Sequence, residues 1–290
     1  MVLRIHRHGD RTPVESTLSL SNDREALVSA SAAYGYGQLT DAGKRRGYAL
    51  GQFIRRRYDG LLSPNYNRSE IYIRSTDSTR TKMTALSAMA AVYSVDQDNW
   101  SDSINWTPIP YTTVPAKYDF VSIFLKRLVV STYFCYKEIA GIALDYLFGS
   151  KDTIIYQSGV LLNQFFAVAD KIIAGEDVQR VQLYSAHDLN VFAFQGVTQI
   201  SVKQGVPKYG SAYALELRRV VATGEYIVVP VYLNTPSEDV VTYLQVSGCD
   251  QRCDIESFRA ITSPYNIGEK EWRTKCGFSE DLDFDTSSID

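Results

Sequence analysis

Short apolar runs alternate with amphipathic segments through the first two-thirds of the chain. Three runs have the length and composition of buried strands: 2–5 (VLRI), 70–75 (EIYIRS) and 181–186 (VQLYSA). Helical spacing of apolar residues marks three further segments: 39–62, 76–93 and 158–175. This alternation predicts an α/β fold, a central mixed sheet with helices on both faces.

The first predicted helix begins near Thr40, with Asp41 in its first turn. Its apolar face consists of Leu50, Phe53, Ile54 and Tyr58. Basic side chains occupy the opposite face: Lys44, Arg45, Arg55 and Arg56. We interpret these cations as a solvated face and not as a phosphate site.

The segments between these elements are polar or rich in proline. Residues 14–38 contain several Ser and Gly, and we expect a loop there. Residues 94–118 contain three prolines, which also predicts a loop. Residues 212–220 and 225–233 predict a β-hairpin.

The most apolar stretch, residues 120–149, predicts packed helices. Four charged residues divide it into runs too short to span a bilayer: Lys126, Arg127, Lys137 and Glu138. The last residues, 279–290, are acidic and contain Ser, which predicts a disordered tail.

Composition adds few constraints. The 290 residues are 45% hydrophobic and 22% charged, as in ordinary globular proteins. A formal net charge of −3 gives no general attraction to nucleic acid or to an acidic membrane surface. Any binding of an anion must therefore be local, and we expect neither a nucleic-acid partner nor a transmembrane span.

Four cysteines suggest an oxidising compartment. Cys249 and Cys253 favour a short disulfide loop, which leaves Cys135 and Cys276 to pair across the fold. A zinc site is the less favoured alternative, because no second close pair and no histidines accompany them. Three triplets fit the N-glycosylation pattern: Asn67, Asn99 and Asn105. No secretory leader is visible before Arg7, and we expect a secreted or lumenal protein whose leader lies outside this sequence.

Charged side chains follow each of the three predicted strands. Ligands of open α/β sheets bind beyond the carboxyl ends of the strands. If the strands are neighbours, their ends bring six residues together: Arg7, His8, Arg11, Arg74, His187 and Asp188. Three guanidinium groups and two imidazoles predict a pocket for a phosphate group. The alternative is a surface loop at 7–13 whose charges pair with Asp10.

The same residues suit a reaction as well as binding. An imidazole among arginines stays neutral and can attack phosphorus, so a histidine of this site can act as a nucleophile. Asp188 can give a proton to the departing alcohol. We expect no metal and no cofactor, because the arginines neutralise the phosphate charge.

Three separated motifs resemble the animal histidine acid phosphatases, the acid phosphatase and phytase branch of the histidine phosphatase superfamily. They are RHGDRTP (7–13), YIRSTDSTRT (72–81) and YSAHD (184–188), and the resemblance extends over most of 3–118 and 156–278. It implies that His8 is phosphorylated, that Asp188 is the general acid, and that Arg7, Arg11, Arg74 and His187 bind phosphate. It gives no such role to His6, and we assign Glu216 to structure only. It also implies hydrolysis of small phosphate monoesters, a glycoprotein that is secreted or lysosomal, and a homodimer.

The chain departs from that family in its cap. About forty residues stand where family members have roughly a hundred, so we expect a reduced helical cap at 119–150. The catalytic domain is then discontinuous, made of 1–118 and 151–278. Two alternatives to an acid phosphatase remain open: a catalytically weak secreted protein that binds phosphate esters, and a phytase or phosphotransferase of the same superfamily.

Overall fold

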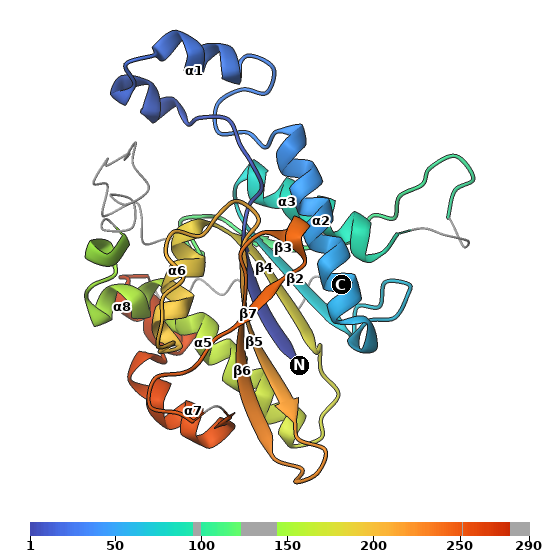
Figure 1. Ribbon diagram of the computed structural model, residues 1–290, viewed down its shortest axis with the longest axis vertical. Helices are drawn as coiled ribbons and strands as arrows, with labels where there is room; N and C mark the ends of the chain where they lie inside the picture. The colour runs from blue at the N-terminus through green and yellow to red at the C-terminus, as the bar shows by residue number, and fades with distance from the viewer. Residues whose placement is uncertain (95–99, 123–143, 251, 279–290) are drawn as a thin grey trace.

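A mixed β-sheet runs through the centre of the protein, with helices on both sides (Figure 1). This is a computed structural model, which describes residues 1–94, 100–122, 144–250 and 252–278. Within these residues the sheet has eight strands in the order β3-β2-β4-β1-β5-β6-β7, with β8 paired to β6. The strands are β1 (Val2–Arg7), β2 (Ile71–Thr76), β3 (Thr112–Val114), β4 (Val181–Ala186), β5 (Ala212–Arg219), β6 (Tyr226–Leu233), β7 (Val241–Tyr243) and β8 (Cys253–Asp254). The α/β prediction is confirmed.

Strand direction divides the sheet into two parts. β4 lies between β2 and β1 and is parallel to both, whereas β1, β5, β6 and β7 pair antiparallel. Every residue of β4 is buried, as expected for a parallel strand covered on both faces. The parallel strands therefore end at one common edge of the sheet.

Alternate residues of β1 enter the two hydrophobic layers that cover the sheet. Val2 packs with α2 (Asp41–Arg57) and α3 (Thr79–Val92) on one face. Leu3 and Ile5 pack with the other layer. Its helices are α5 (Lys151–Ile173), α6 (Asp188–Val197), α7 (Ile255–Thr262) and α8 (Glu269–Lys275).

The predicted apolar face of α2 is buried. Leu50, Phe53, Ile54 and Tyr58 are each at most 5% exposed. The Thr40 hydroxyl accepts a hydrogen bond from the Gly43 amide at 3.2 Å and so caps the helix where the sequence predicted. The basic face is not wholly solvated as predicted, because Arg55 donates hydrogen bonds to the Ser63 and Leu62 carbonyls.

Two predicted loops contain regular structure. Residues 14–38 include a 3₁₀ helix (Glu15–Leu20) and α1 (Arg24–Ser31), which extend away from the sheet (Figure 1). The Asp23 carboxylate caps α1 by accepting from the Ala26 amide at 3.0 Å. Residues 94–118 include β3, which pairs with the end of β2. Neither segment shows an apolar repeat, because α1 is largely exposed and β3 is only three residues long.

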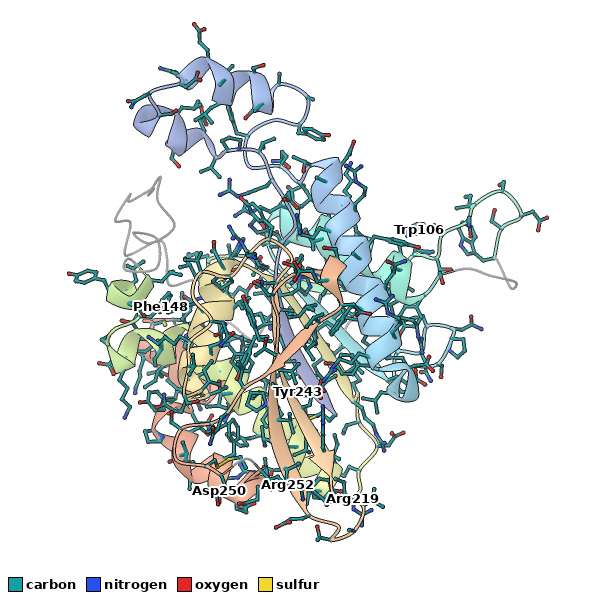
Figure 2. All side chains as sticks on the ribbon, viewed as in Figure 1. Trp106, Phe148, Arg219, Tyr243, Asp250 and Arg252 are labelled. Carbon is teal, nitrogen blue, oxygen red and sulfur yellow. A yellow bond between two sulfur atoms is a disulfide. The ribbon has the colours of Figure 1, made fainter. Side chains whose placement is uncertain are left out.

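The region before α5 also differs from the prediction. α5 begins at Lys151 and not near 158, and its early residue Ile154 is buried. Phe148 lies against α6, with its ring centroid 5.7 Å from that of Phe192 (Figure 2). Most of the expected cap (123–143) and the expected disordered tail (279–290) lie outside the described residues, so the cap, the tail and the homodimer stay predictions.

The short disulfide predicted in the last third of the chain is present between Cys249 and Cys253. It connects β8 to the loop that precedes it. Cys135 lies outside the described residues, so its pairing with Cys276 stays a prediction. The helices of the described part include none that is long and apolar enough to cross a membrane.

Candidate active site

The carboxyl ends of β2, β4 and β1 lie side by side at one edge of the sheet. Arg7 at the end of β1 is in register with Ala186 at the end of β4, and Ser75 of β2 is in register with Ser185. The His8 amide continues this pairing by donating to the Ala186 carbonyl at 3.0 Å. Three segments far apart in sequence therefore present their following residues to a common crevice.

The His8 ring is buried, with 3% exposure, and its tautomer is defined by one contact. Nδ1 lies 2.8 Å from the Gly9 carbonyl oxygen. A carbonyl only accepts hydrogen bonds, so Nδ1 carries the proton and Nε2 keeps its lone pair. Burial, the neighbouring His187 and the positive charges of Arg80 and Arg7 lower the pKa of His8 to about 2. The ring is therefore neutral throughout the acidic range.

The turn after His8 is fixed by direct backbone packing. A Cβ atom on Gly9 would lie 2.3 Å from the Gly43 carbonyl oxygen of α2. The Gly9 amide donates to the Thr84 hydroxyl of α3 at 3.0 Å. Glycine is thus required at position 9 because the loop that carries His8 touches α2 without intervening side chains.

His187 meets His8 from the end of β4. The two ring centroids are 5.5 Å apart in an edge-to-face arrangement. Arg80 Nη2 lies 3.5 Å from His187 Nδ1, and Thr76 Oγ1 lies 3.1 Å from Nε2. Because arginine only donates, Nδ1 is the acceptor, and Nε2 carries the proton toward Thr76. Burial, followed by the charge of Arg80, lowers the pKa of His187.

Asp188 begins α6 and pairs with the first arginine of the site. Its Oδ2 lies 2.9 Å from Arg7 Nη2. The second terminal nitrogen of Arg7 donates to the Pro207 carbonyl at 2.6 Å. The Arg7 guanidinium also stacks 4.0 Å from the centroid of the Tyr209 ring. Arg7 thus connects the proposed acid to the loop before β5.

The other two predicted arginines have different surroundings. Arg11 donates to the Thr12 carbonyl at 2.8 Å, and its charge contributes to the lowered pKa of His187. Arg74 donates to the buried Asp119 carboxylate at 2.6 Å. The structure therefore pairs Arg7 with Asp188 and places His8 edge-to-face with His187. Arg11 is close enough to affect His187, and Arg74 is engaged by Asp119 on the neighbouring segment. Asp10 does not pair with Arg7 or Arg11 but forms a bidentate ion pair with Arg46.

Sequence reasoning missed several residues of this region: Arg46, Arg80, Asp119, Lys208 and Tyr209. Arg80 had a usable signal, since it lies in the first turn of the helix that follows β2. Arg46 is one of several basic residues of α2, and no sequence signal distinguishes it from the others. Its pairing with Asp10 depends on the tertiary fold.

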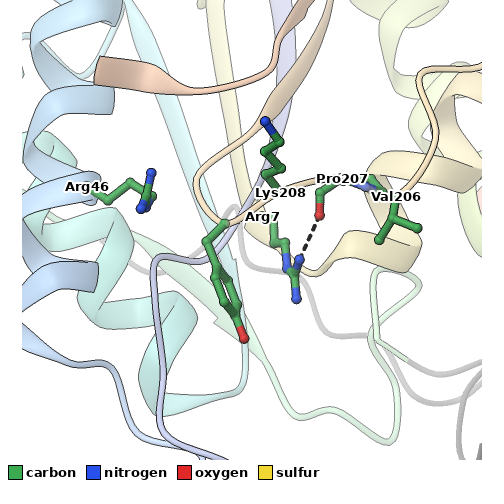
Figure 3. Close-up of a pocket in the computed structure, with 6 residues that line it drawn as sticks. Arg7, Arg46, Val206, Pro207 and Lys208 are labelled. Carbon is green, nitrogen blue, oxygen red and sulfur yellow. Dashed lines mark hydrogen bonds between the residues drawn. The ribbon is translucent and has the colours of Figure 1, made fainter. Parts of the chain in front are cut away.

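A cavity of about 420 Å³ opens beside Arg7 (Figure 3). It is lined by Arg7, Arg46, Val206, Pro207, Lys208 and Tyr209. Arg46 enters from α2, whereas the last four residues belong to the loop before β5. The cavity is therefore adjacent to the histidine site and shares Arg7 with it.

Residues 1–120 match the model of the histidine phosphatase superfamily, branch 2. Among solved structures, Hafnia alvei phytase in complex with tartrate has a TM-score of 0.61 at 13% identity, covering 92% of this chain and 97% of that chain. The phytase of Klebsiella sp ASR1 has a TM-score of 0.58 at 14% identity, covering 92% of this chain and 97% of that chain. These two similarities describe the fold.

Curated sequences specify the family further. Prostatic acid phosphatase of Bos taurus is 28% identical, over 95% of this chain and 87% of its own length. Lysosomal acid phosphatase of Rattus norvegicus is 26% identical, over 97% of this chain and 80% of its own length. The chain is thus similar to the histidine phosphatase superfamily, branch 2, over its first 120 residues, and to curated acid phosphatases over almost its whole length. The alignment with the bovine protein spans 347 positions, so that relative contains segments that this 290-residue chain lacks.

Proposed function

We propose that the protein hydrolyses phosphate monoesters through a phosphohistidine formed on His8. One observation carries the proposal: the proton on Nδ1 is held by the Gly9 carbonyl, so the lone pair of Nε2 is available in a neutral ring. Arg7, Arg11, Arg74 and His187 are the proposed phosphate-binding residues. Their donors neutralise charge on the phosphoryl oxygens as the bond to the leaving group breaks.

Two displacements complete the reaction. His8 Nε2 attacks phosphorus, the bond from phosphorus to the ester oxygen breaks, and Asp188 gives its proton to that oxygen, which leaves as an alcohol. A water molecule then attacks the phosphohistidine, loses a proton to the Asp188 carboxylate, and the P–N bond breaks. Inorganic phosphate leaves, and both side chains return to their starting protonation states.

Arg7 links binding to proton transfer in this scheme. Without substrate it is paired with Asp188 at 2.9 Å. A bound phosphate competes for the same guanidinium and so releases the Asp188 carboxyl group from its ion pair. Substrate binding thus prepares Asp188 for its role as proton donor.

Trapping the intermediate tests this proposal. The protein is mixed with ³²P-labelled phenyl phosphate, quenched within milliseconds in alkali, and digested, because phosphohistidine is stable to alkali and labile to acid. We expect label on the peptide that contains His8, and no label in His8→Gln with retained circular dichroism. Labelled substrate that binds without covalent label or release of phosphate would favour the weak binding protein instead.

The setting of this activity is also a proposal. The prostatic and lysosomal relatives, the Cys249–Cys253 disulfide and the three glycosylation triplets support a secreted or lysosomal glycoprotein. The catalytic domain is proposed to comprise 1–118 and 151–278, interrupted by the reduced cap at 119–150.

A further inference from the structure

The cavity beside Arg7 adjoins the residues that we expect to face the leaving group of a bound phosphate ester. In-line attack by His8 places the leaving oxygen on the far side of phosphorus, next to the acid that protonates it. Asp188 is bonded to one terminal nitrogen of Arg7, and Pro207 to the other. The loop 206–209 therefore borders the leaving-group side of the proposed site.

This loop is held tightly to the histidine motif on both sides of Lys208. Pro207 accepts from Arg7, and the Tyr209 ring packs on Arg7 and lies 5.6 Å from the His8 ring. The Gly210 amide donates to the His8 carbonyl at 3.0 Å. The backbone position of Lys208 is thus set by the same residues that hold the nucleophile.

The cavity contains one cation whose charge is not balanced by a carboxylate. Arg7 pairs with Asp188, and Arg46 pairs with Asp10 through two hydrogen bonds. Within the described part of the chain Lys208 forms no ion pair, and its side chain lines the cavity (Figure 3). An unbalanced ammonium group beside a leaving-group cavity attracts negative charge on the leaving group.

We propose that Lys208 selects phosphate monoesters whose leaving group carries a second anionic group. The inference rests on the proposed function, because that function defines which side of the site receives the leaving group. Substrates of this class are phosphorylated acids and bisphosphates, and either anion fits the chemistry of an ammonium group.

Matched aryl substrates test the selection. We compare kcat/KM for phenyl phosphate, 4-carboxyphenyl phosphate and 1,4-phenylene bisphosphate at pH 5.5. For each charged substrate we take the ratio of its kcat/KM to that of phenyl phosphate. This ratio is compared between the wild-type protein and Lys208→Met, so that differences in intrinsic reactivity cancel. We expect Lys208→Met to lower at least one ratio by about three- to fivefold, as for a solvent-accessible ion pair, and 1 M NaCl to lower the wild-type ratio similarly. The affected substrate identifies the preferred anion.

Lys171→Met is the matched control, because it removes the same charge from an exposed position on α5, outside the cavity lining. Equal ratios in Lys208→Met and wild type would overturn the inference, as would an equal decrease in Lys171→Met.

A measurement without turnover separates this inference from the proposed function. Calorimetry compares the binding of phenylphosphonate and 4-carboxyphenylphosphonate to the wild-type protein and to Lys208→Met. Tighter binding of the carboxylate compound that depends on Lys208 would support the subsite even if no ester were hydrolysed. If the two phosphonates bind equally tightly, the subsite does not accept a carboxylate. If 1,4-phenylene bisphosphonate also binds no more tightly than phenylphosphonate, the subsite accepts neither anion.

Discussion

The Arg7 guanidinium and the Asp188 carboxylate form an ion pair of 2.9 Å across the ends of β1 and β4. Arg7 ends β1, and Asp188 begins the helix after β4. The pair places a carboxylate next to the histidine cluster while the same arginine remains able to turn to a phosphate. This geometry suits the proposed transfer of a proton from Asp188 to the leaving group.

Asp188→Asn keeps the size of the side chain but removes the carboxyl group that we propose as the proton donor. For an alkyl phosphate such as glycerol 2-phosphate, kcat/KM, which reports formation of the phosphohistidine and not its hydrolysis, should fall by about 10²- to 10³-fold, since an alkoxide leaves poorly without a proton. For 4-nitrophenyl phosphate the decrease should be much smaller, because nitrophenolate leaves unprotonated. Steady-state kinetics with both substrates measure the difference. Equal losses with both would assign Asp188 to binding and not to proton transfer.

Gly9→Ala should destabilise the protein and displace the nucleophile. The added methyl group would lie 2.3 Å from the Gly43 carbonyl oxygen, which belongs to backbone and cannot rotate away. We expect a loss of about 1–3 kcal/mol in the free energy of unfolding, measured in urea, together with a loss of activity. Gly60→Ala is the control, since its Cβ would contact nothing within 4 Å. An unchanged urea midpoint for Gly9→Ala would contradict the backbone contact.

Glu216 is a buried carboxylate that accepts hydrogen bonds from two arginines and a tyrosine hydroxyl. Its carboxylate accepts from Arg57 at 2.7 Å, Arg218 at 2.5 Å and the Tyr58 hydroxyl at 2.9 Å, and Arg4 donates to that hydroxyl. Glu216→Gln leaves these cations without a counter-charge, at a cost of about 3 kcal/mol in unfolding free energy. The exposed Glu238→Gln is the control and should change the unfolding free energy little.

The contribution of Glu216 should persist in acid. Burial raises the pKa of its carboxyl group, but hydrogen bonds from Arg57 and Arg218 outweigh burial and hold it below the ordinary value. The stabilisation is therefore complete above the ordinary glutamate pKa and is lost as the pH falls below it, toward the lowered value of the folded state. Wild type and Glu216→Gln should differ by a constant unfolding free energy from pH 5 to 7 and converge below pH 4. Convergence already at pH 6 would contradict this behaviour.

The buried histidines also make stability fall on acidification, but at a higher pH than Glu216 does. Burial, His187 and the nearby arginines lower the pKa of His8 to about 2, whereas an unfolded histidine titrates near 6.5. Between these values the unfolded chain binds the proton and the folded protein does not, so stability falls as the pH decreases from 6.5. Each such histidine contributes up to about 1.4 kcal/mol per pH unit. His8→Gln should show a shallower decrease of unfolding free energy between pH 6.5 and 4, and parallel curves would contradict the neutral ring.

The strands and their ends could be predicted because their signals are local. Apolar runs of four to six residues that stop at charged residues identified β1, β2 and β4, and a general property of α/β sheets grouped their ends. The pairing of Arg46 with Asp10 could not be predicted, since it joins residues of two elements whose contact depends on the glycines at 9 and 43. α1 was missed because its side chains face solvent and leave no apolar repeat.

The position of β1 in the sheet also determines when the site can form during synthesis. Val2 of β1 pairs with Val181 of β4 on one side and with Glu216 of β5 on the other. β4 and β5 are synthesised long after β1, so β1 and the histidine motif stay unpaired until most of the polypeptide has been made. A truncated translation product that ends before β4 therefore contains His8 but neither strand that flanks β1, and it should be inert and prone to capture by chaperones.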